Sequence, residues 1–215
     1  MTLATMLTTM GEGMLRTCLI FVLTLVGSLP LGMIVALLRQ SKSKLVSGVI
    51  KVYISIMRGT PLMLQLLAWY FGPYYLFKMQ IRDWRFPAII IGFVLNYAAY
   101  FAEIYRGGIE SMPVGQYEAA QVLGYTKSQT FMRIILPQVV KRILPSVTNE
   151  VITLVKDTSL AFTLAYQEVF SIAKQISASQ TSFTPFLIAG VFYFIANYVV
   201  AYGMERIEKA FDYYK

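Results

Sequence analysis

Four long apolar segments are the feature of this sequence that most restricts its fold. They cover residues 15–38, with Arg16 at one edge, and the uncharged stretches 59–77, 86–102 and 183–204. A helix needs about 20 apolar residues to cross the hydrocarbon core of a bilayer. Helices and closed barrels are the structures that satisfy their backbone groups there. We therefore predict an all-α, polytopic integral membrane protein.

The composition supports this class. Of the 215 residues, 57% are hydrophobic and 14% are charged. A soluble domain carries about 25% charged residues, so this chain lacks the polar surface that would cover a globular fold in water. A chain of this length has room for five spans with their connecting loops.

The fifth span is harder to place, because charges interrupt the apolar residues between 134 and 176. Ionisable groups at membrane depth normally face the interior of a bundle or a water-filled cavity. We therefore predict a protein-facing span at 137–157, followed by a shorter helix near 160–176. The chain then forms one transmembrane domain, residues 1–215, with spans at about 15–38, 59–77, 86–106, 137–157 and 183–204.

Basic residues orient these spans. With the N-terminus outside, the inner segments 39–51, 106–133 and 205–215 hold ten Lys and Arg, against six in the outer segments. Cytoplasmic loops carry an excess of Lys and Arg. We expect the N-terminus outside and the C-terminus in the cytoplasm. Residues 1–12 lack the basic start of a cleaved signal peptide, so the first span is expected to be retained.

Several chemistries are excluded by composition. The chain has no histidine and one cysteine, Cys18, which argues against a zinc site, a Cys–His nucleophile or an internal disulfide. It contains no Gly-Lys dipeptide and hence no P-loop for ATP. The net charge of +8 is scattered among apolar runs, which suits anionic lipid better than nucleic acid. We expect no metal, no cofactor and no nucleic acid on this chain.

The loop at 108–133 carries the sharpest local signal. Pro113 and Gly115 precede a short predicted helix, and Gly124 is suited to the left-handed residue that ends it. Thr126 and Gln129 have the spacing of a capping box that starts a second helix. Two short helices meeting at a glycine would form a compact knob on the inner face.

The knob has two interpretations on physical grounds. Ala119 and Ala120 would allow another backbone to approach closely, with Glu118 offering one charge. An amphipathic helix lying on the membrane surface is the alternative. The sequence Glu118-Ala119-Ala120, followed by Gly124 and Ile135-Leu136-Pro137, resembles the EAA signature of the membrane subunits of ATP-binding-cassette (ABC) importers.

Three further segments carry the same resemblance, which extends over nearly the whole chain. Arg58-Gly59-Thr60-Pro61-Leu62, Ala99-Tyr100-Phe101-Ala102-Glu103 and Lys156-Asp157-Thr158-Ser159-Leu160 resemble segments of the polar amino acid branch of these importers. Met57 departs from the aromatic residue expected before Arg58.

The resemblance implies a type I importer permease of a bacterial inner membrane. In that family two membrane subunits, identical or related, pair above two ATPase subunits and below a soluble amino-acid-binding protein. ATP and Mg²⁺ belong to the ATPases. The loop then acts as the coupling helix, with Gly115, Glu118, Ala119, Ala120 and Gly124 as the candidate ATPase contacts.

Four polar residues are candidates for the substrate pathway. Glu103 either faces the pathway or pairs with Arg106, three residues along the same helix. Asn149 and Glu150 lie inside the predicted fourth span. They either line the pathway or gate, or Glu150 pairs with Lys141 or Arg142. 

Asp157 has two possible roles as well. It could pair with Lys156 of a second subunit or bind substrate. Carboxylates near the pathway favour a cationic or neutral polar amino acid as the substrate.

The segment Arg58, Gly59, Thr60 and Pro61 is most simply a structural turn. Thr60 would cap the following helix, with Pro61 at its first position. Arg58 would be an anchor that reaches to the inner headgroups.

Two other classes remain open on the residues alone. One is an ion-gradient-driven secondary transporter or channel, for which Glu103, Glu150 and Asp157 could supply ion sites. The other is a membrane scaffold without transport. Co-purification of a soluble ATPase would separate both from an importer subunit.

Overall fold

The computed structural model describes residues 2–79 and 81–211, and this part of the chain is helical without a strand. Its elements, in chain order, are α1 (Leu3–Arg39), α2 (Lys44–Gly59), α3 (Leu62–Phe77), α4 (Arg85–Glu110), α5 (Val114–Val122), α6 (Lys127–Thr130), the π-helix η1 (Phe131–Ile135), α7 (Leu136–Asp157), the 3-10 helix η2 (Thr158–Leu164), α8 (Val169–Gln180) and α9 (Thr184–Ala210).

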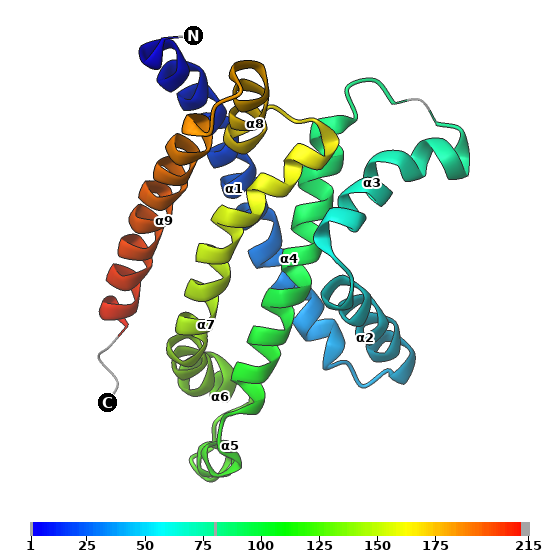
Figure 1. Ribbon diagram of the computed structural model, residues 1–215. Helices are drawn as coiled ribbons and strands as arrows, with labels where there is room; N and C mark the ends of the chain where they lie inside the picture. The colour runs from blue at the N-terminus through cyan, green and yellow to red at the C-terminus, as the bar shows by residue number, and fades with distance from the viewer. Residues whose placement is uncertain (1, 80, 212–215) are drawn as a thin grey trace.

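The long helices α1, α4, α7 and α9 run between two ends of the molecule (Figure 1). The short helices α5 and α6 lie at one end, and α8 lies at the other, beside the start of α1. Helix α3 projects away from the bundle. The most extensive packing joins α1 to α4, whose Phe93, Tyr97 and Phe101 are among the largest fully buried side chains.

Three helices are long and apolar enough to cross a membrane among the residues described, namely α1, α4 and α9. They contain the predicted spans 15–38 and 86–106 and, apart from its first residue, 183–204. Helix α1 begins well before residue 15, because Met6 and Met10 are buried in a cluster with Val169, Ile172 and other residues of α8 and α9. Packing, rather than bilayer thickness, thus sets where this helix starts.

Helices α3 and α7 occupy the positions of the predicted spans 59–77 and 137–157. Helix α3 is shorter than the other three, and α7 carries more charged residues. A five-span arrangement therefore stays a prediction. The expected inner segment 39–51 is instead largely helical, because α2 covers Lys44–Gly59. The amphipathic sequence of α2 has no long apolar run, which is why hydropathy did not identify it.

The expected turn at Thr60 and Pro61 differs in detail. Thr60 ends α2 in an extended conformation, and Pro61 is itself the N-cap of α3. A residue before proline is restricted to such conformations. The Thr60 hydroxyl donates to Ile56 O at 2.8 Å, so it does not cap α3 as predicted.

Two buried amides satisfy the backbone at this helix break. Gln65 Nε2 donates to Met57 O at 3.0 Å and to Thr60 O at 3.1 Å. Asn96 Nδ2 donates to Met57 O at 2.9 Å and to Gln65 Oε1 at 3.0 Å. An unsatisfied carbonyl in an apolar setting is costly, so these amides explain how α2 and α3 can separate inside the protein.

The region expected to hold one short helix near 160–176 is divided. The 3-10 helix η2 ends at Leu164 and is capped by Ala165, which has a left-handed φ of 51°, and α8 starts only after Glu168. The side chain of Glu168 accepts hydrogen bonds from Phe170 N and Ser171 N and caps α8. A buried acidic cap, which the hydropathy pattern does not reveal, therefore sets this boundary.

Glu168 lies outside the predicted spans and gives a pH-dependent prediction. Burial raises the pKa of this fully buried carboxyl from 4.5 to about 6. The folded state therefore binds the proton more tightly than the unfolded state does. The contribution of this group to the free energy of unfolding is complete below pH 4.5 and is lost as the pH rises through about 6. Through this group, the free energy of unfolding of the wild-type protein should fall by about 2 kcal/mol between pH 4.5 and 7.5. Thermal unfolding in detergent measures it, and Glu168→Gln should flatten the pH dependence; an unchanged slope would contradict it.

Gly108 gives a second prediction, because α4 and α7 approach closely there. A Cβ on Gly108 would lie 2.2 Å from Ile143 Cγ2, whereas one on the neighbouring Gly107 would meet nothing within 4 Å. Gly108→Ala should therefore destabilise the protein by about 1–3 kcal/mol. Gly107→Ala is the matched control and should be neutral or stabilising by up to about 1 kcal/mol. Thermal unfolding in detergent compares them, and equal effects would contradict the close approach.

Candidate coupling surface and translocation pathway

The knob predicted within residues 108–133 consists of α5 and α6. Gly124 has a φ of 79°, the left-handed conformation expected at the end of the first helix. Thr126 and Gln129 form the predicted capping box. Helix α5 begins at Val114, so Gly115 lies inside it rather than before it. The expected two-helix motif is thus confirmed in its main features.

The predicted contact residues differ in exposure. Gly115, Glu118 and Ala119 are exposed, whereas Ala120 is only 1% exposed and packs inside the chain. Ala120 therefore cannot offer its side chain to a partner in this conformation, which corrects that part of the prediction. Large apolar side chains are exposed instead: Val114 by 70%, Val122 by 87% and Leu123 by 73%.

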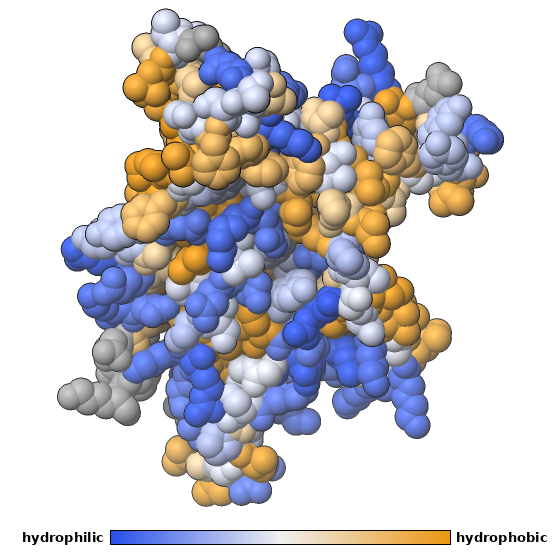
Figure 2. Space-filling view, in the orientation of Figure 1, coloured by the Kyte–Doolittle hydropathy of each residue, from blue (hydrophilic) through white to orange (hydrophobic). Residues whose placement is uncertain are grey.

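These residues define the coupling tip, the exposed surface of residues 114–124. It lies at the bottom of Figures 1 and 2, where hydrophobic residues appear on the end of the molecule. Exposed apolar residues grouped on a projecting element are typical of an interaction surface. The geometry suits docking to another protein.

The coupling tip is joined directly to α7. Gln116 and Gln138 exchange reciprocal amide hydrogen bonds, both of 2.9 Å. The Arg142 guanidinium donates to the Ser111 hydroxyl at 2.9 Å, which fixes the segment before α5. Helix α6 continues through η1 into α7 without a break in helical structure. A displacement of the tip would therefore be transmitted to α7.

An ion-pair network connects α2 to the C-terminal half of α4. Arg106 binds Glu103 at 2.7 Å and also Glu110, as the spacing along the helix allows. Arg58 approaches Glu103 at 3.7 Å and stacks over the Tyr100 ring at 5.3 Å. The pairing of Glu103 with Arg106 is thus present. Arg58 contacts α4 rather than acting as a free headgroup anchor, which revises its expected role.

The polar residues of α7 face different surroundings. The Tyr97 hydroxyl of α4 donates to Asp157 Oδ2 at 2.7 Å. Glu150 is half-buried and Asn149 is exposed. Arg142 contacts Ser111 and is not the partner of Glu150. Asp157 thus has an internal partner that neither sequence-based alternative included.

Sequence reasoning gave no hydrogen-bonding role to the amides Gln65, Asn96, Gln116 and Gln138 or to the phenol of Tyr97. A polar amide within an apolar helix is a usable signal for the first two, because it needs a partner there. No local pattern indicates that Gln116 and Gln138, which lie on different helices, would meet.

The helical membrane fold, the projecting tip and the polar groups on α4 and α7 together define a transport protein of the permease class. The chain belongs to the family described as binding-protein-dependent transport system inner membrane component, whose model matches residues 28–213. It is a membrane component of a transport system rather than an enzyme, and ATPase and binding-protein partners are expected.

Known relatives agree with this assignment. The L-cystine transport system permease protein TcyB of Bacillus subtilis is 36% identical over 95% of this chain and 87% of its own length. The putative glutamine transport system permease protein GlnP of Rickettsia bellii is 35% identical over 92% of this chain and 90% of its own.

Solved structures give the same fold. An amino acid ABC transporter crystallised with histidines matches with a TM-score of 0.88 and 30% identity, over 98% of this chain and 100% of that one. The MetNI methionine ABC transporter matches with a TM-score of 0.73 at 18% identity, which shows the fold alone.

Proposed function

We propose that this chain is the permease subunit of an ABC importer for polar amino acids and forms the pathway through the membrane. The observation that carries the proposal is the exposed apolar coupling tip, hydrogen-bonded through Gln116 to Gln138 on α7. Relatives that carry cystine or glutamine in their names support the substrate class.

The proposed assembly contains two permease subunits, identical or related, and two ATPase subunits at the coupling tips. A soluble amino-acid-binding protein lies at the opposite face. ATP and Mg²⁺ are bound by the ATPases, and this chain binds no cofactor. Gly115, Glu118, Ala119 and Gly124 contact the ATPase surface, and closure of the ATPases moves α7 through the tip.

Five spans follow if α3 and α7 cross the membrane together with α1, α4 and α9. The N-terminus is then outside and the C-terminus cytoplasmic. The positive-inside balance supports this orientation. The start of α1 and the end of α9 lie at opposite ends of the bundle, which fits an odd number of spans (Figure 1).

The proposed pathway is lined by Glu103, Asn149, Glu150 and Asp157, with a cationic or neutral polar amino acid as the substrate. Polar groups within an apolar bundle are normally functional. Arg58 and Asp157 both act electrostatically on Glu150, which supports the proposal that these groups share one region of the pathway.

Asp157→Asn tests the pathway assignment. Tyr97 can still donate to the new amide oxygen, so only the charge is removed. Uptake of L-arginine into proteoliposomes should fall by about tenfold or more, since a hydrogen bond to a charged group contributes about 1.5–3 kcal/mol. Uptake of L-glutamine should change less. Glu205→Gln, on the exposed side of α9, is the control; equal losses for both substrates would make Asp157 structural.

Purification tests the assembly. The tagged chain, expressed from its native locus and extracted in mild detergent, should bring down a soluble ATPase of different mass in a stable ratio. Basal ATP hydrolysis should accompany the complex. A purified chain that transports amino acids with an ion gradient and without an ATPase would overturn the proposal in favour of a secondary transporter.

A further inference from the structure

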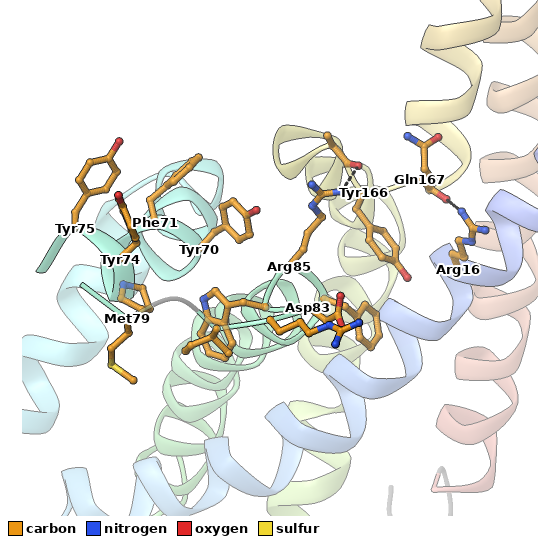
Figure 3. Close-up of a pocket in the computed structure, with 16 residues that line it drawn as sticks. Arg16, Tyr70, Phe71, Tyr74, Tyr75, Met79, Asp83, Arg85, Tyr166 and Gln167 are labelled. Atoms are coloured by element: carbon orange, nitrogen blue, oxygen red, sulfur yellow. Dashed lines mark hydrogen bonds and ion pairs between the residues drawn. The ribbon is translucent and has the colours of Figure 1, made fainter. Parts of the chain in front are cut away.

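A cavity of about 1090 Å³ opens at the end of the molecule opposite to the coupling tip. Figure 3 shows its walls: the C-terminal part of α3, the connection from α3 to α4, and the segment that follows η2. None of the proposed pathway residues lines it. The cavity is therefore separate from the proposed pathway.

Two arginines from different helices converge on one wall. Arg16 of α1 donates to Gln167 O at 3.1 Å, and Arg85 of α4 donates to Ala165 O at 3.4 Å. Both side chains thus hold the segment that contains Tyr166, and Figure 3 places them on its two sides. Each guanidinium has five N–H donors, so most remain available to a ligand.

The charge of the lining favours an anionic group. Arg16, Arg82 and Arg85 are its cations and Asp83 its single anion, which leaves a balance of +2. Asp83 approaches Arg82 at 3.6 Å, and both are almost fully exposed at the rim. The two anchored arginines therefore provide the positive charge of the inner wall, while Asp83 offers a negative group at the edge.

Backbone strain is concentrated at the same cavity. Ala165 and Asp83 have φ values of 51° and 54°, and Lys78, with 55°, directly precedes the lining residue Met79. Non-glycine residues seldom adopt this conformation, and it persists where the surrounding structure enforces it. Arg85 supplies such a restraint and thus holds the backbone of the cavity wall at Ala165.

Aromatic rings complete the lining. Tyr70 and Tyr74 come from α3, while Phe86 stacks on Tyr166 with ring centroids 5.5 Å apart. Trp84 is fixed by its indole N–H, which donates to Trp69 O at 3.0 Å. Faces of such rings attract ammonium groups and cover apolar chains.

We propose that this cavity receives a free amino acid at the outer face, with the α-carboxylate at Arg16 and Arg85 and the ammonium end at the aromatic faces and Asp83. The inference rests on the proposed import function and adds a receiving site outside the pathway. A zwitterion matches both the arginines of the inner wall and the aromatic faces with Asp83 at the rim, whereas an anionic phospholipid headgroup such as phosphatidylglycerol would use only the first. The cavity is larger than one amino acid, which suits a vestibule.

Trp84 allows a direct test by fluorescence, because the chain contains only two tryptophans, Trp69 and Trp84. In Trp69→Phe the backbone acceptor is kept and Trp84 reports alone. The full-length variant in phosphatidylcholine nanodiscs is titrated with L-arginine and with L-argininamide, which lacks the carboxylate. L-arginine should give a saturable change in fluorescence, and L-argininamide should bind about tenfold more weakly or worse.

Arginine variants locate the site. Arg16→Met and Arg85→Met should each weaken L-arginine binding by about tenfold, whereas Arg206→Met, near the end of α9, should leave it unchanged. Comparison of the two ligands on Trp69→Phe alone needs no arginine variant and so stays decisive if either arginine variant fails to fold. Equal responses to the two ligands would overturn the proposal. So would a response only to phosphatidylglycerol in the nanodisc, which would assign the cavity to lipid.

The outcome is separable from the import function. ATP-driven uptake by the assembled transporter tests the proposed function, whereas Trp84 fluorescence measures ligand binding in the cavity. Uptake without a fluorescence response would remove the vestibule and leave the importer assignment intact.

Discussion

Gly124→Val should reduce coupled transport by more than tenfold while leaving the chain inserted and folded. Gly124 has a φ of 79° and ends α5. A β-branched residue in this conformation costs about 1–2 kcal/mol, so the turn would relax and redirect the coupling tip. A Cβ at this position meets nothing within 4 Å, so the effect comes from the backbone and not from a clash in the core.

Transport and ATP hydrolysis must be measured on the same reconstituted complex. Uncoupling predicts that hydrolysis continues while substrate uptake per ATP falls. Gly190→Val is the matched control, because Gly190 lies within α9 without a positive φ and with open space around its Cβ position. Wild-type uptake in Gly124→Val with the ATPase still bound would refute the assignment of this turn to coupling.

Gln138→Leu should likewise reduce transport per ATP by about tenfold. The substitution removes both hydrogen bonds to Gln116 and the one to Ile134 O in η1. Both amides are half-buried. An unsatisfied buried partner costs about 1–3 kcal/mol, so the expected loss lies toward the lower end of that range and is comparable with the energy that links coupled sites. The tip would still dock, but its movement would be transmitted to α7 less effectively.

A double variant separates this link from simple instability. In Gln116→Leu/Gln138→Leu two apolar side chains face each other, so stability should recover while coupling stays low. Gln175→Leu, at an exposed position of α8, controls for the loss of an amide. If the double variant regains both stability and transport, the amide pair serves folding alone and does not transmit movement.

Local sequence located most of the helices. The apolar runs identified the regions of α1, α3, α4 and α9, since the cost of placing a side chain in lipid depends on that side chain. The left-handed Gly124 and the capping box at Thr126 followed from local backbone preferences as well. The start of α1 did not, because it depends on burial of Met6 and Met10 against α8.

The candidate site divides in the same way. Glu103 and Arg106 lie three residues apart on one helix, so their pairing was foreseeable. The bonds from Tyr97 to Asp157 and from Gln116 to Gln138 join residues 60 and 22 positions apart. Such pairs depend on how helices pack, which residue types alone do not specify. Burial of Ala120 reversed one expectation for the same reason.

The sequence by itself determined that this chain resides in a membrane, contains no ATP-binding loop and carries a knob of two helices that meet at a glycine. These properties depend on composition and on local backbone energetics. The tertiary structure decided which knob residues are exposed, how the knob is joined to α7 and that two distant arginines share one cavity wall. Those properties arise from contacts between helices, whose energies exist only once the helices have packed.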